Sequence, residues 1–493
     1  MGLPMLCRFL ISASLGSALL LSGCTRGGDG AVEVVVIGEP SDLTTTGVRL
    51  PPAAALIAGA TAQGLVRIDE AGQIVPGIAE RWIVTEDGLS YIFRIRESEP
   101  PGGEKLTART VQQALSSAVR SMARTSLGRD LSQIRDIRAM TGRVIEIRLT
   151  SPMPGFLQLL AQPELGVRIG AATSGPMQAT ARDGSLVLDV LPPEARGYPS
   201  QPEWAESVRQ VRVTAMDAAG ATQAFSDGRF QLLLGGTIGD LPRVSVGPLS
   251  RGTIRLDSVI GLFGLDVARP QGFLASATNR EALALALDRP ALLKPFNIAG
   301  WNPTTRLVAP GLPDDPGIVG ERWGPLSAEQ RRSIAAARIA RWRASNGGSL
   351  VLAVFLPKGP GYDILFGTLA GQLAEVGLSL TRAASAASAD LVLRDRAARY
   401  AGPRWFLDQF ACPIAPRQCL PEVDSLVESA AQIPDAVQQE RLLAQAEDAL
   451  TAANLYVPLG APIRFSLVRS RVQGFSENAW GVHPLFPLSG API

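Results

Sequence analysis

The stretch Gly64–Glu97, which reads GLVRIDEAGQIVPGIAERWIVTEDGLSYIFRIRE, decides the fold. Two turn signals, Asp69–Gly72 and Glu86–Gly88, separate short apolar runs. Such spacing predicts consecutive β-hairpins. After the second turn, apolar residues occupy alternate positions over Tyr91–Ile95, which is typical of a strand with one buried face.

Strand and helix signals alternate on both sides of this stretch. Val32–Ile37 and Leu350–Leu356 are apolar runs typical of strands buried on both faces. Thr107 can cap a helix, and Thr278 with Glu281 matches a capping box. The alternation predicts α/β lobes. Open α/β sheets bind ligands beyond the carboxyl ends of their strands, so two facing lobes would enclose a cleft.

Length and composition exclude several classes of protein. The 493 residues exceed what one hydrophobic core usually supports, so two or three domains are expected. The 47 basic and 45 acidic side chains nearly balance, which argues against a nucleic-acid partner. The single histidine, His483, argues against a Ser-His-Asp triad or a zinc site, so no catalytic residue, metal or cofactor is predicted.

The N-terminus has the features of an export signal. Arg8 precedes an apolar run, Phe9–Leu21, that is shorter than the roughly 20 residues of a transmembrane helix. Leu21-Ser22-Gly23-Cys24 then resembles a lipobox. That resemblance implies cleavage after residue 23 and fatty chains on Cys24, and an ordinary signal peptide is the alternative. Residues 24–30 would form a short tether.

Two cysteines remain beyond the signal, Cys412 and Cys419, and the sequence between them is turn-like. An exported chain meets oxidising conditions, which favour a disulfide between them. Two free buried thiols are the alternative.

The stretch quoted first resembles the signature of the solute-binding proteins of peptide- and nickel-type ABC importers, family 5 of the bacterial extracellular solute-binding proteins. The match runs without a gap from Leu65 through Asp69, Trp82 and Tyr91 to Arg96. Further similar motifs follow in the family's order: Leu106-Thr107-Ala108, Ser174-Gly175-Pro176-Met177, Asn279–Arg289, Val457-Pro458-Leu459 and Val472-Gln473-Gly474-Phe475.

The resemblance implies a type II periplasmic-binding-protein-like α/β fold. Two lobes are joined by a hinge, and the first lobe carries an extra domain. The domains implied are 31–55 with 171–265 and 473–493 for the first lobe, 56–170 for the extra domain and 266–472 for the second lobe.

The resemblance also implies a function and candidate site residues. The expected protein is a monomeric, lipid-anchored periplasmic receptor that is no enzyme and that delivers a peptide or peptide-like ligand to an ABC permease and its ATPase. Trp405-Phe406-Leu407-Asp408 stands where the family has its ligand-binding motif, so Asp408 is the candidate ammonium anchor and Trp405 the cleft wall. Tyr362 and Asp266 are weaker candidates.

Other readings of the same scaffold stay open. The ligand can be a nickel chelate, an opine, haem or an oligosaccharide, or the chain can be a divergent envelope lipoprotein without a transport role. For the anchor, an Asp in an exposed loop and a Trp in the core are the alternative to ligand contact.

Overall fold

The computed structural model describes residues 30–98, 105–169, 172–244, 252–312 and 315–490. The predicted signal segment, Cys24 and most of the tether lie outside these ranges. None of the described helices has the length and apolar character needed to cross a membrane.

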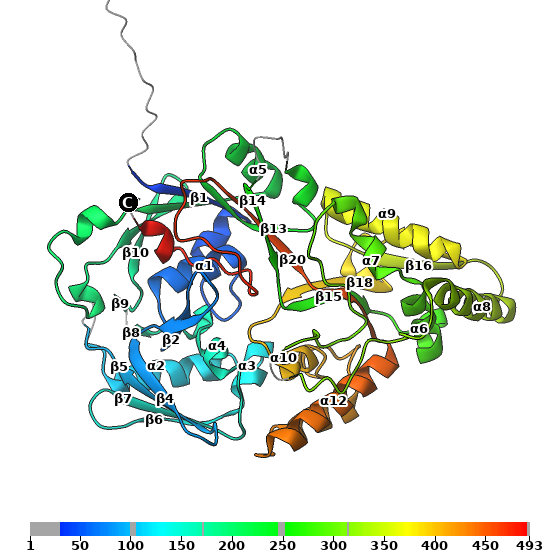
Figure 1. Cartoon of the computed structure of the whole chain (residues 1–493), viewed down its shortest axis with the longest axis horizontal. Coiled ribbons are helices and arrows are strands. Elements are labelled where there is room, and N and C mark those ends of the chain that lie inside the picture. Colours follow the sequence, from blue (N-terminus) through cyan, green and yellow to red (C-terminus); the bar gives the residue numbers. More distant parts are fainter. Residues whose placement is uncertain (1–29, 99–104, 170–171, 245–251, 313–314, 491–493) are drawn as a thin grey trace, which may run out of the picture.

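The first lobe is built on a seven-stranded mixed sheet, which lies on one side of the molecule in Figure 1. Apolar β-branched residues give its central strand, β1, burial on both faces, as predicted. In spatial order the strands are β10 (Met177–Arg182), β11 (Ser185–Val190), β12 (Val211–Met216), β1 (Val32–Ile37), β13 (Leu232–Thr237), β20 (Ile463–Val468) and β14 (Ile254–Ser258). Helices α1 (Pro52–Thr61) and α5 (Ala218–Ser226) pack against this lobe.

The extra domain contains the signature stretch. The alternation over Tyr91–Ile95 produces strand β5, whose Tyr91, Phe93 and Ile95 are buried. The sheet has the order β4 (Ala79–Val84), β5 (Ser90–Ile95), β7 (Val144–Leu149) and β6 (Ile134–Ala139). The other elements are hairpin β2 (Val66–Ile68) and β3 (Ile74–Pro76), the short pair β8 (Arg168–Ile169) and β9 (Ala172–Thr173), and helices α2 (Ala108–Ser121), α3 (Ser126–Leu131) and α4 (Phe156–Leu160).

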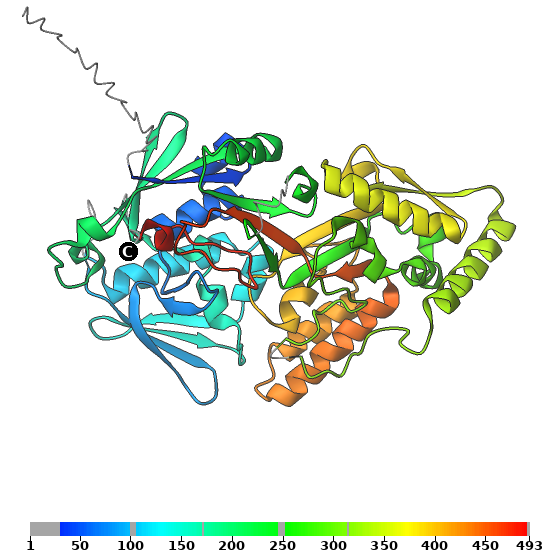
Figure 2. The same cartoon turned by 45° about the horizontal axis from the view of Figure 1, so that its top comes forward.

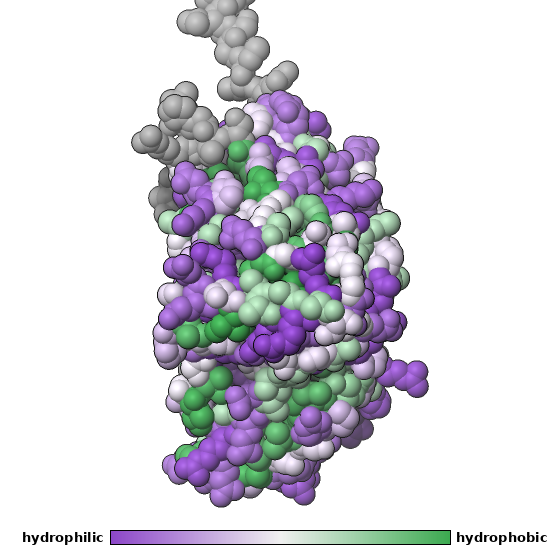
Figure 3. Space-filling view, turned by 90° about the vertical axis from the view of Figure 1, so that its right-hand side faces the viewer, coloured by the Kyte–Doolittle hydropathy of each residue, from purple (hydrophilic) through white to green (hydrophobic). Residues whose placement is uncertain are grey.

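The second lobe is built on a five-stranded sheet flanked by helices, and Figure 2 shows it beside the first lobe. The strand order is β17 (Leu378–Arg382), β16 (Leu350–Phe355), β18 (Leu391–Ala397), β15 (Gly261–Val267) and β19 (Tyr456–Gly460). The helices are α6 (Ala277–Ala286), α7 (Arg289–Leu292), α8 (Ala328–Asn346), α9 (Pro360–Glu375), α10 (Pro403–Asp408), α11 (Pro421–Ala430) and α12 (Ala436–Ala453). On the face of this lobe in Figure 3, hydrophobic side chains are interspersed among hydrophilic ones.

Strand pairing shifts three of the predicted domain boundaries. β15 pairs with β18 and β19 of the second lobe, so the chain crosses before Gly261 and not at 265. β20 pairs with β13 and β14 of the first lobe, so the return crossing precedes Ile463 and not 473. The boundary at 56 falls inside α1, whose Ala53 and Ile57 pack on the first sheet. The pairing of strands that are distant in sequence decides where the chain crosses between the lobes.

One predicted cap forms and the other does not. The Thr107 hydroxyl accepts a hydrogen bond from the Thr110 backbone N–H and starts α2. The capping box of Thr278 and Glu281 is wrong, because α6 begins at Ala277. The Glu281 carboxylate instead accepts charge-assisted bonds from Arg338 and Arg322, which are stronger than a bond to a neutral backbone N–H.

Candidate functional site

A cleft of about 1040 Å³ lies where the two lobes and the extra domain meet. Its lining combines residues from both lobes, the extra domain and the C-terminal segment. Val36 and Gly235 come from the first sheet, Arg124 and Glu164 from the extra domain, and Asp395 and Gln409 from the second lobe. The C-terminal segment 480–486 completes the wall. Ligand sites usually have this concave form and a size up to about 1,000 Å³.

An ion pair between the two lobes lies in the cleft lining. Asp395 of β18 lies 2.7 Å from Arg464 of β20. The ion pair engages Oδ1 of the Asp395 carboxylate, whereas Oδ2 has no hydrogen-bond partner among the described residues. Burial raises the pKa of Asp395, although the Arg464 guanidinium opposes the shift. The carboxylate therefore retains unused acceptor capacity beside the cavity, where a cation would be stabilised.

Basic side chains outnumber acidic ones in the lining. Six arginines line the cavity against two carboxylates: Arg49, Arg67, Arg124, Arg396, Arg399 and Arg464, with Glu164 and Asp395. Both carboxylates are paired, Glu164 with Arg399 at 2.9 Å and Asp395 with Arg464. Within the described parts of the chain, the other four arginines have no carboxylate within ion-pair distance. This excess favours a ligand that carries negative charge.

Aromatic side chains form part of the walls. Trp405, Trp480 and Phe486 line the cavity. Trp480 is held in place because its indole N–H donates to the Gly72 carbonyl at 3.0 Å. Trp405 packs edge-to-face on Phe406 with ring centroids 4.9 Å apart, and only 1% of Trp405 is exposed. The structure thus puts the predicted wall residue beside the cavity, and its contact with a ligand stays a prediction.

Asp408 lies outside the cleft lining and has protein partners on both carboxylate oxygens. Arg129 Nε donates to Oδ1 at 2.9 Å, and Arg404 Nε donates to Oδ2 at 3.2 Å. The side chain is fully buried. A ligand ammonium would have to displace a guanidinium to reach it. The proposed anchoring role of Asp408 stays a prediction, and it requires that Arg129 or Arg404 first move away from the carboxylate.

A second buried carboxylate adjoins Asp408 at the contact between the extra domain and the second lobe. Asp130 accepts a hydrogen bond from the Tyr400 hydroxyl at 2.8 Å. Burial and then the negative charge of Asp408 raise the pKa of Asp130 well above its ordinary value. A continuous hydrophobic cluster, including Phe156 and Phe406, spans the same contact. The extra domain and the second lobe are therefore joined by both apolar and polar groups.

Tyr362 and Asp266 are absent from the cleft lining. Tyr362 is at the start of α9, and its hydroxyl lies 3.4 Å from Thr237 Oγ1 of the first lobe. Burial raises the pKa of Tyr362 to about 12. Asp266 of β15 forms an ion pair with Arg394 at 2.9 Å. These contacts give Tyr362 a packing position between the lobes and Asp266 a structural partner, while ligand contact by either stays a prediction.

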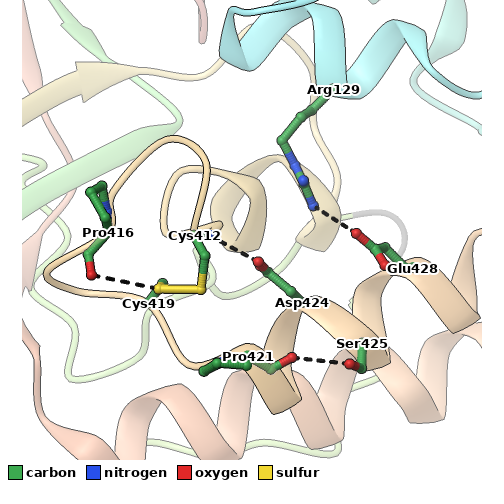
Figure 4. Close-up of a disulfide and its surroundings, with 8 residues drawn as sticks. All are labelled: Arg129, Cys412, Pro416, Cys419, Pro421, Asp424, Ser425 and Glu428. Atoms are coloured by element: carbon green, nitrogen blue, oxygen red, sulfur yellow. Dashed lines mark hydrogen bonds and ion pairs between the residues drawn. A yellow bond between two sulfur atoms is a disulfide. The ribbon is translucent and has the colours of Figure 1, made fainter.

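A disulfide joins Cys412 to Cys419 beside α10, as the sequence predicted. Figure 4 shows it near Asp424, whose carboxylate accepts a hydrogen bond from the Cys412 backbone N–H at 2.9 Å. Arg129 extends from α3 towards Glu428 of α11 in the same view, at 4.0 Å. The closed loop thus adjoins the contact that holds Asp408.

Several cleft residues had no recognisable signal in the sequence. Asp395 and Arg464 are ordinary charged residues in apolar strands of two different sheets, and only the packing of the two lobes brings them together. Trp480 sits in an irregular segment. His483 also lines the cavity, and its Nε2 lies 2.9 Å from Asp257 Oδ2. Within the described residues, no group of three or more His, Cys, Asp or Glu side chains is arranged to hold a metal ion.

Comparisons with known proteins match this architecture. Residues 73–381 match the family model described as bacterial extracellular solute-binding proteins, family 5 Middle. A Pseudomonas aeruginosa protein named "Probable di/tripeptide-binding protein 5" is 25% identical over 545 aligned positions, which cover 96% of each chain.

Solved structures share the fold at low sequence identity. The Haemophilus influenzae OppA complex with the peptide RPPGFSPFR has a TM-score of 0.75 at 16% identity, with 93% of this chain and 99% of that chain covered. The Escherichia coli murein tripeptide binding protein MppA gives 0.75 at 16%, with 93% and 98% covered. These likenesses show the two-lobed fold, and the family model covers more than half of the sequence. The chain belongs to the bacterial extracellular solute-binding proteins of family 5.

Proposed function

We propose that this chain is the extracytoplasmic receptor of an ABC importer, which captures a short peptide or peptide-like ligand between its lobes and delivers it to a membrane permease. The observation that carries the proposal is the cleft, with Asp395 and Arg464 from opposite lobes in its lining. A relative that covers nearly the whole chain is named for di- and tripeptides. The receptor would act by binding alone, as a monomer, and without a cofactor.

The cleft chemistry suits a zwitterionic ligand with further negative charge. The Asp395 carboxylate is placed to accept a ligand ammonium, and Arg464 with the unpaired arginines is placed to meet carboxylates. The apolar walls would cover side chains of varied shape. Because a ligand in this cleft contacts both lobes, its binding would stabilise the closed arrangement.

Membrane attachment is part of the proposal. The lipobox-like sequence before Cys24 supports a lipid anchor, which would hold the receptor at the periplasmic face of an envelope membrane. Mass spectrometry of the N-terminal peptide tests this point directly. Mature protein that begins at residue 24 with a diacylglyceryl-modified cysteine is expected, and an unmodified Cys24 would contradict it.

The binding proposal is tested with protein extracted from the envelope in detergent. Ligand released by unfolding is identified by mass spectrometry, and calorimetry then measures affinity for it and for di- and tripeptides. Asp395→Asn is expected to weaken binding of free-amine peptides at least tenfold, while Asp183→Asn, at an exposed turn of the first lobe, should leave it unchanged. Failure of every peptide to bind, with a sugar or metal chelate released instead, would refute the peptide assignment.

A further inference from the structure

A smaller cavity of about 40 Å³ opens beside the ligand cleft and shares Gln63, Arg67 and Phe486 with it. A water needs about 10–15 Å³ of such space, so the cavity has room for roughly three waters. A space of that size suits one carboxylate group or one tetrahedral oxyanion. The cavity is therefore a side pocket of the cleft at its first-lobe end.

Three arginines from two parts of the fold line this side pocket. Arg67 and Arg96 belong to the extra domain, and Arg196 to the first lobe. Within the described ranges, no carboxylate lies within ion-pair distance of any of the three. The side chains of Arg67 and Arg196 make no hydrogen bond to a described residue, and Arg196 Nε is buried without a partner. A buried guanidinium N–H without an acceptor is costly, so an oxyanion that accepts a hydrogen bond from Arg196 Nε would be stabilising here.

Electrostatics agree with this geometry. Burial lowers the pKa of Arg196, and the positive charges of Arg96 and Arg67 add to the shift. Burial also lowers the pKa of Arg67; Tyr198, Asp69 and Glu70 oppose the shift, and the positive charge of Arg96 adds to it. The like charges thus repel one another within the folded protein, and an anion placed among them would remove that repulsion.

Aromatic rings and a tight turn hold the arginines in position. The Arg96 guanidinium lies 4.1 Å from the centre of the Tyr198 ring, and that of Arg196 lies 5.3 Å from the centre of the Phe486 ring. Gly197 between Arg196 and Tyr198 has a φ of +78°, and a Cβ there would lie 2.4 Å from the Glu97 carbonyl oxygen. Only glycine permits this close approach. The trio is therefore preorganised.

We propose that Arg67, Arg96 and Arg196 form a binding subsite for a small oxyanion, a carboxylate or phosphate group, at the first-lobe end of the ligand cleft. Guanidinium groups bind such oxyanions with paired, charge-assisted hydrogen bonds. The subsite itself stands on the arginine geometry. That its anion is the acidic end of the cleft ligand rests on the proposed function, because the pocket and the cleft share Arg67.

The test uses thermal unfolding of the full chain with inorganic phosphate or acetate, against sodium chloride at matched ionic strength. Either anion is expected to raise the unfolding temperature, by roughly 2 °C or more at saturation. For Arg196→Gln and Arg67→Gln, the anion concentration that gives half of the full temperature rise should be at least tenfold higher. Arg182→Gln, an exposed arginine of β10, removes the same charge outside the pocket and should leave the response intact.

A second measurement separates an anion site from a structural arginine cluster. In chloride alone, Arg196→Gln should unfold at the same temperature as the native chain or higher, because it removes a repelling charge. A lower unfolding temperature in chloride together with an unaltered anion response would overturn the subsite. So would a native chain that responds to neither anion beyond the chloride control.

Competition then identifies the source of the anion. Phosphate that weakens peptide binding to the native chain, but not to Arg196→Gln, would assign the pocket to the ligand's acidic end. Phosphate and peptide that bind independently would refute that assignment and support a free anion. A chain that binds phosphate through the trio but binds no peptide would refute the proposed function and leave the subsite supported.

Discussion

Arg129 of α3 lies 2.9 Å from Asp408 of α10, and this ion pair joins the extra domain to the second lobe across 279 residues of sequence. The pair is buried, with 17% of the Arg129 side chain and none of the Asp408 side chain exposed. The Arg129 guanidinium thus pairs with the carboxylate that the family resemblance assigns to binding a ligand ammonium. The contact between the extra domain and the second lobe therefore includes this ion pair, which is made by protein side chains alone.

Removing Arg129 should loosen that contact. Arg129→Met leaves Asp408 with Arg404 alone, and breaking a buried pair typically costs 3–5 kcal/mol, so we expect a loss of about 2–3 kcal/mol in the free energy of unfolding because one partner remains. Urea unfolding measures the loss, and small-angle scattering should show a larger radius of gyration. Arg138→Met breaks an exposed pair of the same domain and should cost under about 1 kcal/mol. Equal effects of the two substitutions would contradict the role of Arg129.

Asp408→Asn tests the family-derived anchor against the contact described above. If Asp408 binds the ligand ammonium, free-amine peptides should lose affinity by about tenfold or more, while N-acetylated peptides keep theirs. If Asp408 acts through Arg129, both peptide classes should weaken alike, because the lobes close less readily. Calorimetry with matched peptide pairs separates these results. Unchanged affinity for both classes would remove Asp408 from ligand binding and closure.

Asp130 should make stability depend on pH. Its pKa is raised in the folded protein by burial and by Asp408, so between the ordinary carboxyl pKa near 4 and the raised value the folded state binds more protons than the unfolded state. Stability from this group is therefore present at acidic pH and is lost as pH rises through the raised pKa. Asp130→Asn should remove this loss. The unfolding temperature of the variant minus that of the native chain should therefore increase from pH 4 to pH 8. Parallel curves for variant and native chain would contradict the shift.

The disulfide should contribute measurably to stability. Cys412 and Cys419 are seven positions apart. Closing a loop of that size lowers the entropy of the unfolded chain, which stabilises the folded state by about 2.5 kcal/mol. The double substitution Cys412→Ser and Cys419→Ser should lower the free energy of unfolding by that amount in urea. Dithiothreitol should destabilise the native chain and leave the double variant unchanged. Insensitivity of the native chain to the reductant would show that the bond adds nothing.

Local patterns in the sequence predicted much of the fold. The turns and alternation around Tyr91 gave the hairpins and strand β5, and the apolar run at Val32 gave a buried central strand, because turn chemistry and side-chain periodicity act over a few residues. The Thr107 cap was predicted for the same reason. The cap at Thr278 was not formed, because distant arginines competed for Glu281.

The sequence by itself determined the α/β class and the family and predicted an export signal and a cysteine pair, since each depends on residues that are neighbours in the chain. Only the tertiary structure decided which strands cross between the lobes and that Asp408 faces Arg129. It also brought Asp395 to Arg464 and gathered Arg67, Arg96 and Arg196. Charges interact over a few ångströms of space, and that distance is set by packing between elements that lie far apart in the sequence.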